Sequence, residues 1–387
     1  MRFIILSFAW AAFLASAAST SLGDPGPLIV HEWGTFTSIA GADGTAIEWL
    51  PQAGPTDLPC FVERNRFNIK GSLSGTVRME TPVLYFYAAR ETTANVNVRF
   101  RQGVITEWFP PAAITPGNGL VPGGSQSIAW RNVKVSPGLV EDFPVEHGAS
   151  HYYAARRTGA SPLQSGSHKE KFLFYRGVGR FALPIAATVD ADGRVTVRNP
   201  RGQPVGDVIL FDNHGGRIVY EVRRALGGQV IVDPQVADQK PTTELENLLL
   251  ANGLYADEAS AMIETWRDSW FEEGTRVIYI VPRLAIDTIL PLEIEPTPAS
   301  VARVFVGRME LVTPATKKEI KDALLANHLA TLQSRGRFLE AIGRRIVTES
   351  APGDRALLER RLRDASSTWV TPQDGCGRTT EQRGARD

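Results

Sequence analysis

Three carboxylates crowd the end of one predicted helix, at Asp268, Glu272 and Glu273, just before the predicted helix stop Gly274. Asp268 and Glu272 are like charges four residues apart, which disfavours a helix by about 0.2–0.5 kcal/mol. The negative end of the helix dipole disfavours Glu272 and Glu273 by a further ~0.3–1 kcal/mol each. Either an arginine from elsewhere neutralises these groups, or they are retained as acid/base groups or metal ligands. The three are therefore the candidate catalytic residues.

The helix that carries these carboxylates has one apolar face. Its apolar residues recur at spacings of three and four, which predicts an amphipathic helix packed on a sheet: Ala259, Met262, Ile263, Trp266 and Trp270. The tryptophans are core residues in this interpretation, and Trp270 is a candidate ligand platform in the alternative one. On the opposite face, Glu264 and Arg267 are three residues apart and can pair. Arg267 is also a candidate ligand-binding residue.

The motif HEWGTF begins at His31. On a regular strand neighbours alternate, so His31 shares a side with Trp33 while Glu32 faces the other side. His31 and Glu32 therefore form no adjacent acid–base dyad unless Gly34 marks a β-bulge. Two hypotheses remain open, a buried tryptophan beside a solvent-facing neighbour and a carbohydrate-stacking surface. In the second, His31, Glu32 and Trp33 are ligand-binding residues.

His147 and His151 are four residues apart, so they share a face on a helix or on a strand. Neutral imidazoles are common zinc ligands. The sequence HGASH nevertheless differs from HExxH, because it lacks the glutamate that serves as base in zinc hydrolases of that pattern. A divalent metal bound by these histidines is possible, and no other cofactor is evident.

Aromatic and charged residues are interleaved in HYYAARR (151–157) and EKFLFYRGVGR (170–180). The charged residues here include Arg156, Glu170 and Arg176. We predict that they form a buried ion network, or that they supply the partners which the carboxylates at the helix end lack. The candidate ligand-binding residues in these two stretches are Tyr153, Arg156 and Arg176.

The chain of 387 residues starts with MRFIILSFAWAAFLASAAST. One basic residue, an apolar run and the small residues Ala15 and Ala17 are typical of an export signal, here residues 1–17. No later stretch approaches 18 uninterrupted apolar residues, so we expect no transmembrane segment after signal removal. The predicted location is periplasmic or extracellular.

The charges balance, with 42 basic and 42 acidic residues. Nonspecific nucleic-acid affinity comes from accumulated positive charge, so we expect no nucleic-acid partner. An envelope component or a glycan is the expected partner class. The sequence has two cysteines, Cys60 and Cys376, which can pair in an oxidising compartment.

Short strands separated by turns dominate as far as about residue 240, and helices dominate after about residue 314. We predict an α+β fold with N-terminal β-sandwich-like antiparallel sheets, an α/β segment and a helical C-terminal tail. The predicted divisions are a β-rich domain over 18–240, an α/β segment over 241–313, a helical region over 314–370 and a disordered tail over 371–387.

Four turn dipeptides predict β-hairpins, at Asp43-Gly44, Gln102-Gly103, Asp192-Gly193 and Gly227-Gly228. The Pro- and Gly-rich interval 110–124 is predicted to be a long loop. Loops of that size either serve a site or are mobile.

Five stretches together resemble a group of exported bacterial proteins known mainly as uncharacterised open reading frames: HEWGTFTS, METPVLYFY, HYYAAR, EKFLFYRGVG and WRDSWFEEG. The resemblance covers nearly the whole mature chain. It implies export and carries no assigned activity with it.

The leading hypothesis is an exported, non-catalytic binding or envelope-associated protein, because no complete catalytic motif is present. The first alternative is a hydrolase that uses the carboxylate cluster on a glycan or envelope substrate. The second alternative is a metal-binding protein built on His147 and His151.

Overall fold

The computed structural model describes residues 27–48, 50, 58–65, 74–146, 150–234 and 240–367. The predicted signal peptide and the predicted tail 371–387 lie outside these ranges. The strands are β1 (Ile29–Gly41), β2 (Glu63–Arg64), β3 (Val77–Tyr87), β4 (Thr92–Arg101), β5 (Gly103–Phe109), β6 (Ala113–Ile114), β7 (Ser125–Val135), β8 (Leu163–Ser165), β9 (His168–Glu170), β10 (Leu173–Gly179), β11 (Ala186–Val189), β12 (Val195–Arg198), β13 (Val208–His214), β14 (Arg217–Arg223), β15 (Gln229–Val232), β16 (Gly274–Ile280), β17 (Leu292–Glu295) and β18 (Ser300–Val312). The helices are η1 (His151–Arg156), α1 (Pro241–Ala251), α2 (Ala256–Trp270), α3 (Arg283–Ile289), α4 (Pro314–Ala326), α5 (Leu329–Gln333), η2 (Gly336–Phe338), α6 (Leu339–Glu349) and α7 (Pro352–Ser367).

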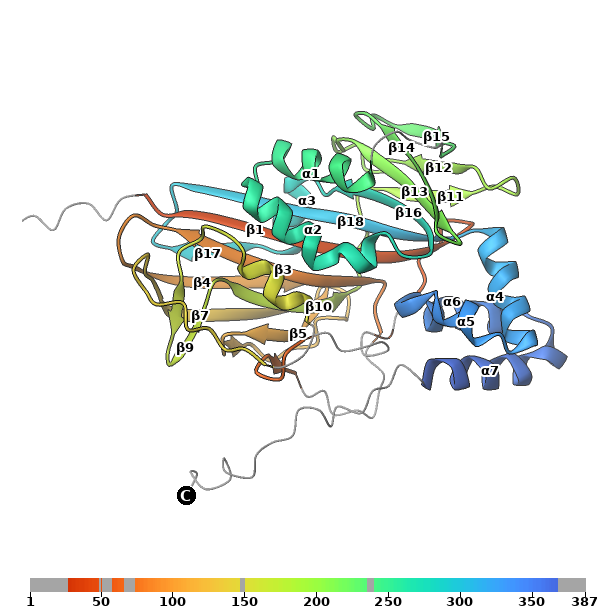
Figure 1. Cartoon of the computed structure of the whole chain (residues 1–387), viewed down its shortest axis with the longest axis horizontal. Coiled ribbons are helices and arrows are strands. Elements are labelled where there is room, and N and C mark those ends of the chain that lie inside the picture. Colours follow the sequence, from red (N-terminus) through yellow and green to blue (C-terminus); the bar gives the residue numbers. More distant parts are fainter. Residues whose placement is uncertain are drawn as a thin grey trace, which may run out of the picture.

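The strands form three sheets (Figure 1). The central sheet has nine strands in the order β14-β13-β16-β18-β1-β3-β10-β5-β2. Its long strands β1 and β18 pair in parallel, whereas its other neighbours are antiparallel. A second sheet has the order β17-β4-β7-β8-β9 with β6 beside β7, and a third has the order β11-β12-β15. The fold is α+β, with antiparallel sheets in the N-terminal part and helices at the C-terminal end.

The main core lies between one face of the central sheet and the second sheet. Strand β4 shows why, since Val96, Val98 and Phe100 are buried while Arg99 between them is exposed. These apolar side chains belong to the same buried cluster as Phe36 of β1. Alternation of this kind places one side of β4 in a sandwich core and the other in solvent.

Helices cover the opposite face of the central sheet. Figure 1 shows α1 and α2 lying across the strands around β1 and β18. Trp266 and Trp270 of α2 are buried there in one cluster with Trp33 of β1. The predicted amphipathic helix therefore exists, and its tryptophans are core residues.

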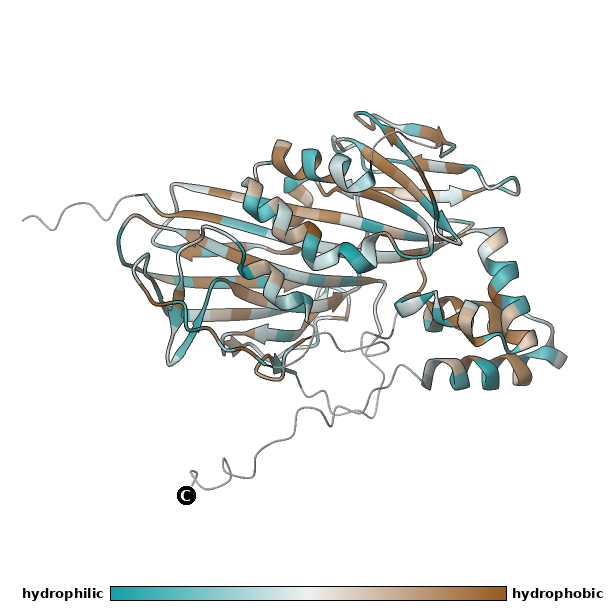
Figure 2. Cartoon of the chain, in the orientation of Figure 1, coloured by the Kyte–Doolittle hydropathy of each residue, from teal (hydrophilic) through white to brown (hydrophobic). Residues whose placement is uncertain are grey.

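The last four α-helices and η2 form a helical unit, residues 314–367, at one end of the central sheet (Figure 1). Its own apolar cluster includes Ile320, Ile342 and Leu358, and it extends to Ile39 of β1. Figure 2 shows that these helices carry both hydrophobic and hydrophilic residues, as expected for amphipathic helices. The unit is thus fixed to the sheet by a shared core.

Two of the four predicted hairpins are wrong. The chain does turn at Gln102, but β4 pairs with β7 and β17 whereas β5 pairs with β10 and β2. The turn is therefore a crossover from one sheet to another. At Gly227-Gly228 the chain likewise leaves the central sheet, because β14 pairs with β13 and β15 pairs with β12. The hairpin at Asp192-Gly193 is confirmed by the antiparallel pairing of β11 with β12, and the one at Asp43-Gly44 by the antiparallel bridge between Ala40 and Ala46.

The predicted division at residue 240 does not separate two sheets. Strands β16 and β18 follow this position in the chain, yet they lie in the central sheet between β13 and β1. No helix among the described residues is long and apolar enough to cross a membrane. The segment 241–313 thus completes a sheet that the N-terminal part begins.

Candidate ligand-binding site at the end of the central sheet

The three predicted catalytic carboxylates point to different surroundings. Helix α2 ends at Trp270, so Asp268 lies in its last turn while Glu272 and Glu273 lie in the connection to β16. The Asp268 side chain is 66% exposed and lies 3.5 Å from Nε2 of His151. These carboxylates therefore do not form one catalytic group.

Glu272 is neutralised by arginines from the central sheet. Its Oε1 accepts a hydrogen bond from Nη2 of Arg308 at 2.8 Å and lies 3.8 Å from Nη2 of Arg276. Arg276 also donates to the main-chain carbonyls of Glu272 and Glu273, beyond the end of α2. The hypothesis that arginine compensates the misplaced carboxylates is confirmed for Glu272, with partners from β16 and β18.

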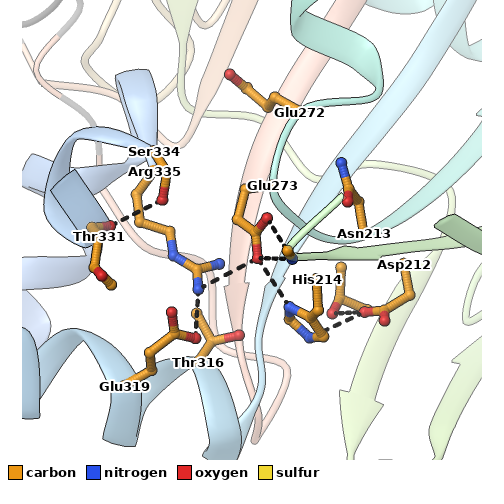
Figure 3. Close-up of polar contacts among 12 residues, drawn as sticks. Asp212, Asn213, His214, Glu272, Glu273, Thr316, Glu319, Thr331, Ser334 and Arg335 are labelled. Carbon is orange, nitrogen blue, oxygen red and sulfur yellow. Dashed lines mark hydrogen bonds and ion pairs between the residues drawn. The ribbon is translucent and has the colours of Figure 1, made fainter. Parts of the chain in front are cut away.

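Glu273 turns the other way, into a group that we call the junction cluster: Asp212, His214, Glu273, Glu319 and Arg335 (Figure 3). Its Oε1 lies 3.2 Å from Nδ1 of His214 and 3.8 Å from Nη2 of Arg335. The same guanidinium reaches Oε2 of Glu319 at 2.6 Å. The junction cluster thus joins the end of the central sheet to the helical unit.

The hairpin from β13 to β14 positions the sheet side of the junction cluster. Gly215 and Gly216 form its turn with φ of +60° and +79°, a conformation that glycine adopts without strain. The Gly215 amide donates to both carboxylate oxygens of Glu273, at 3.0 and 3.2 Å. On the neighbouring strand the Thr275 hydroxyl donates to Oδ1 of Asp212 at 2.5 Å. The turn therefore orients Glu273, and Thr275 orients Asp212, the two carboxylates that face His214.

The helical side is positioned by the direct passage from β18 into α4. Thr313 caps α4 by accepting a hydrogen bond from the Thr316 amide at 3.0 Å, and Pro314 occupies the first turn. Glu319 follows less than two turns later. Arg335 lies between α5 and η2 and its side chain is only 1% exposed. This arginine is therefore held in place beneath the exposed Glu319.

A buried ion pair supports the site from within the sheet. Nε of Arg276 lies 2.8 Å from Oε2 of Glu310, and both side chains are almost fully buried. The Phe338 ring lies near the guanidinium groups of Arg276 and Arg308, at 5.5 and 4.8 Å. Burial raises the pKa of Glu310 to about 7, although the positive charge of Arg276 acts against the rise. Glu310 thus holds its proton into the neutral range.

A second buried glutamate near the helical unit behaves differently. Burial alone would raise the pKa of Glu80, but Arg337 and Arg78 outweigh it and hold the pKa at about 2. Nη1 of Arg337 lies 2.5 Å from Oε1 of Glu80, and the Thr37 hydroxyl donates to Oε2 at 2.6 Å. Glu80 is therefore ionised throughout the neutral range.

The junction cluster does not have the order of a nucleophilic triad. In such a triad the imidazole lies between the hydroxyl and the carboxylate, so that it can take the hydroxyl proton. Here Asp212 lies between the other two, since Oδ1 accepts from Thr275 and lies 3.4 Å from Nε2 of His214. His214 therefore cannot activate Thr275. Its side chain is 43% exposed, which leaves it accessible to a ligand.

The residues of HEWGTF occupy both faces of the central sheet. Nδ1 of His31 lies 2.8 Å from Oε2 of Glu258 in α2, on the face where Trp33 is fully buried. Glu32 accepts hydrogen bonds from Tyr175 at 2.6 Å and from Arg303 at 2.5 Å on the other face. A register shift next to Gly34 marks a bulge, but it does not bring His31 and Glu32 together. The alternation predicted for this motif is thus present. The expected solvent-facing neighbour is wrong, because Glu32 is fully buried, and the carbohydrate-stacking surface is wrong, because Trp33 is fully buried as well.

Two other candidate ligand-binding residues belong to η1, Tyr153 within it and Arg156 at its end. Arg156 forms two hydrogen bonds with Glu170, at 2.9 and 2.6 Å, and its guanidinium lies 4.9 Å from the Tyr153 ring. Burial raises the pKa of Glu170 against the effect of Arg156. The pair of Arg156 with Glu170 is confirmed, and Arg176 donates to the Thr81 hydroxyl.

Two further candidates lie on α2. Trp270 is fully buried and stacks on Trp266 with ring centroids 6.3 Å apart. Arg267 is exposed and pairs with Glu264 at 3.0 Å, as the helical spacing predicted.

The metal prediction falls partly outside the described residues, because His147 is not among them. His151 is 41% exposed and lies near Asp268. Within the described ranges, no group of three or more His, Cys, Asp or Glu side chains is arranged to hold a metal ion. Cys60 is disulfide-bonded, and Cys376 lies outside the described residues.

Sequence reasoning missed most of the junction cluster. Asp212 and His214 are two residues apart, a spacing that places them on one side of a strand. Glu319 and Arg335 carry no local signal, because their role depends on how the helical unit meets the sheet.

No protein-family model matches this chain, and no curated protein matches it. Among solved structures, the chain is similar to the yeast delta-COP-I mu-homology domain complexed with a Dsl1 WxWxV peptide, at 8% identity and a TM-score of 0.28. That match covers 74% of this chain and 99% of the other. The same domain without the peptide matches at 8% identity with a TM-score of 0.26, covering 75% and 100%. A likeness at these scores supports no conclusion on fold or function.

Proposed function

We propose that this protein is an exported, envelope-associated binding protein, and that the junction cluster recognises a positively charged group of its ligand. One observation carries the proposal. Two carboxylates of the cluster, Glu273 and Glu319, share the single guanidinium of the buried Arg335, and a third, Asp212, lies 3.4 Å from the exposed imidazole of His214. A cationic ligand would complete the charge balance at this surface.

Two features of the chain support the export part of the proposal. The first 17 residues have the composition of a signal peptide. Cys60 is disulfide-bonded, and disulfides are rare in the reducing cytoplasm. As part of the same proposal, the chain belongs to the group of exported bacterial proteins that its sequence resembles. Mass spectrometry of the protein recovered from its cells tests export, with an N-terminus after Ala17 as the expected result.

Binding is tested by calorimetry with a trilysine peptide and with the same peptide acetylated on its side-chain amines. We expect the charged peptide to bind and the acetylated peptide to bind at least tenfold more weakly. Glu273→Gln should weaken the charged peptide similarly, because it removes the central carboxylate of the cluster. Asp268→Asn is the matched control, an exposed carboxylate outside the cluster. Equal binding of both peptides, or no effect of Glu273→Gln, would refute the proposal.

A hydrolase is the second candidate function, favoured by one observation. His214 is exposed and lies near the carboxylates of Glu273 and Asp212, as a general acid or base held in position by a carboxylate would be. A screen of glycan and envelope substrates tests it. Any hydrolysis detected should fall at least a hundredfold in His214→Ala, and an activity that survives this change belongs to another site.

A further inference from the structure

A cavity of 330 Å³ lies on the second sheet, apart from the elements that carry the junction cluster. We call it the arginine pocket, and its lining residues are Arg99, Arg101, Gln102, Gly123, Gly124 and Ser125. Its volume is at the small end of the range for ligand sites, about 300–1,000 Å³. No acidic residue lines it.

The two arginines lie on the outer face of β4, two residues apart, and both are exposed. Neither has an ion-pair partner or a side-chain hydrogen bond among the described residues. Two like charges on the same side of one strand repel each other. An anionic ligand placed between them would remove this repulsion and accept hydrogen bonds from both guanidinium groups.

The rest of the lining also offers hydrogen-bond donors. Ser125 lies opposite Arg101 in the pairing of β4 with β7, so both side chains are on the same face of the sheet, and the serine hydroxyl can donate. Gln102 is the turn residue between β4 and β5, and its side-chain amide can donate as well. This set of donors matches the oxygens of a phosphate group.

The long loop that ends at Gly124 forms one wall of the pocket and is pinned to the sheets. A Cβ at Gly119 would lie 1.7 Å from the carbonyl oxygen of Gly103, and one at Gly124 would lie 2.3 Å from that of Asn118. The Gln102 amide donates to the Gly124 carbonyl at 2.8 Å. The glycines therefore allow a close backbone approach that gives the wall a defined shape.

The arginine pocket combines two neighbouring guanidinium groups with a cavity and a wall of defined shape. We therefore propose that it binds a phosphate group of a small ligand or of a lipid headgroup. The site is independent of the junction cluster, so either proposal can fail alone.

Calorimetry with pyrophosphate and with glycerol 3-phosphate tests the soluble sources, and sedimentation with phosphatidylglycerol vesicles tests the lipid source, with phosphatidylcholine vesicles as the reference. We expect binding in at least one arm, and we expect the double variant Arg99→Gln/Arg101→Gln to lose at least tenfold in affinity there. Binding of the soluble probes identifies a small ligand, and binding of the anionic vesicles alone identifies a headgroup.

The matched control is Arg131→Gln, an exposed arginine of β7 outside the pocket. It should change affinity less than twofold, and so should Glu273→Gln at the junction cluster. All these positions except Glu273 are exposed, so the variants should fold, which the melting temperature checks. Absence of binding in every arm, or equal losses in the double variant and in Arg131→Gln, would overturn the proposal.

Discussion

The end of the central sheet and the arginine pocket treat charge in opposite ways. At the sheet end, Arg276, Arg308 and Arg335 are buried, and each meets a carboxylate. In the pocket, Arg99 and Arg101 are exposed, and no carboxylate lines the cavity. Buried charges must be paired because unpaired ones cost several kcal/mol. Exposed charges are free of that constraint, so they can be left available for a ligand.

The charged residues at the end of the central sheet have two roles. The innermost pair, Arg276 with Glu310, holds the structure together, whereas His214 and Glu319 face outward. Substitutions should therefore have stability effects that fall steadily from the buried pair to the surface.

The largest effect is expected for Arg276→Met. It leaves Glu310 buried without its cationic partner and removes the hydrogen bonds to two main-chain carbonyls after α2. Glu310 takes up a proton when its partner is lost, so the cost comes mainly from these two hydrogen bonds of a charged group, at about 1.5–3 kcal/mol each, and the free energy of unfolding should fall by about 3–5 kcal/mol. Urea denaturation at pH 7 measures it, with Arg131→Met as the exposed control. A loss below about 1 kcal/mol would show that the pair contributes little.

The next effect is a pH dependence that distinguishes Glu310 from Glu80. The raised pKa of Glu310 contributes stability that is fully present below about pH 4.5 and lost as the pH rises through about 7. Since each tenfold change in proton affinity is worth about 1.4 kcal/mol, this loss is bounded at about 3 kcal/mol. The lowered pKa of Glu80 contributes stability that is present above about pH 4.5 and lost as the pH falls through about 2.

Urea denaturation between pH 5 and pH 8 measures this difference. Glu310→Gln should flatten the decline of stability across that range, because glutamine keeps the shape of the protonated carboxyl group without titrating. Glu80→Gln is the matched control and should leave the slope intact while lowering stability at every pH in the range. The same slope in the wild type and in Glu310→Gln would contradict the assignment.

A smaller effect is expected for Glu273→Gln. It weakens the contacts of Glu273 with His214, the Gly215 amide and Arg335, and hydrogen bonds to a charged group contribute about 1.5–3 kcal/mol when buried. Because Glu273 is partly exposed and glutamine can still accept, the expected loss is about 1 kcal/mol. Asp268→Asn should stay within about 0.5 kcal/mol, as is usual for exposed ion pairs. Thermal denaturation of the two variants side by side gives the ranking, and a reversed order would be evidence against it.

The smallest effect, with the opposite sign, is expected for Arg101→Gln. Removing one of two like charges on the same side of β4 should leave stability unchanged or raise it by a few tenths, about 0.2–0.5 kcal/mol. Adding salt screens the same repulsion and should reduce the gain. Thermal denaturation at low and at high salt provides the measurement. A clear loss of stability would mean that Arg101 has a structural partner.

The sequence predicts local features of this molecule well. The alternation of HEWGTF assigned His31 and Glu32 to opposite faces of a strand, and the helical spacing assigned Trp266 and Trp270 to a core. The misplacement of Glu272 at a helix end also predicted an arginine partner. Each of these predictions follows from neighbours within a few residues of one another, where the geometry of a strand or a helix is fixed.

Long-range pairing could not be predicted in the same way. The partner of Glu272 is Arg308, 36 residues away, and their contact depends on where β18 lies in the sheet. The turn at Gln102 has the same sequence signal for a hairpin and for a crossover between sheets, because both need a residue that accepts positive φ. Which of the two forms depends on the strands with which β4 and β5 pair.

The parallel pairing of β1 with β18 constrains how the chain acquires its structure. Residues 29–41 pair with residues 300–312, so the middle of the central sheet is completed only when both ends of the folded region are available. Contacts so distant in sequence are slow to form, and until they form one edge of β1 is open to other strands. A nascent chain that ends before residue 300 therefore cannot fold to this structure, and it is the form of the protein most exposed to aggregation.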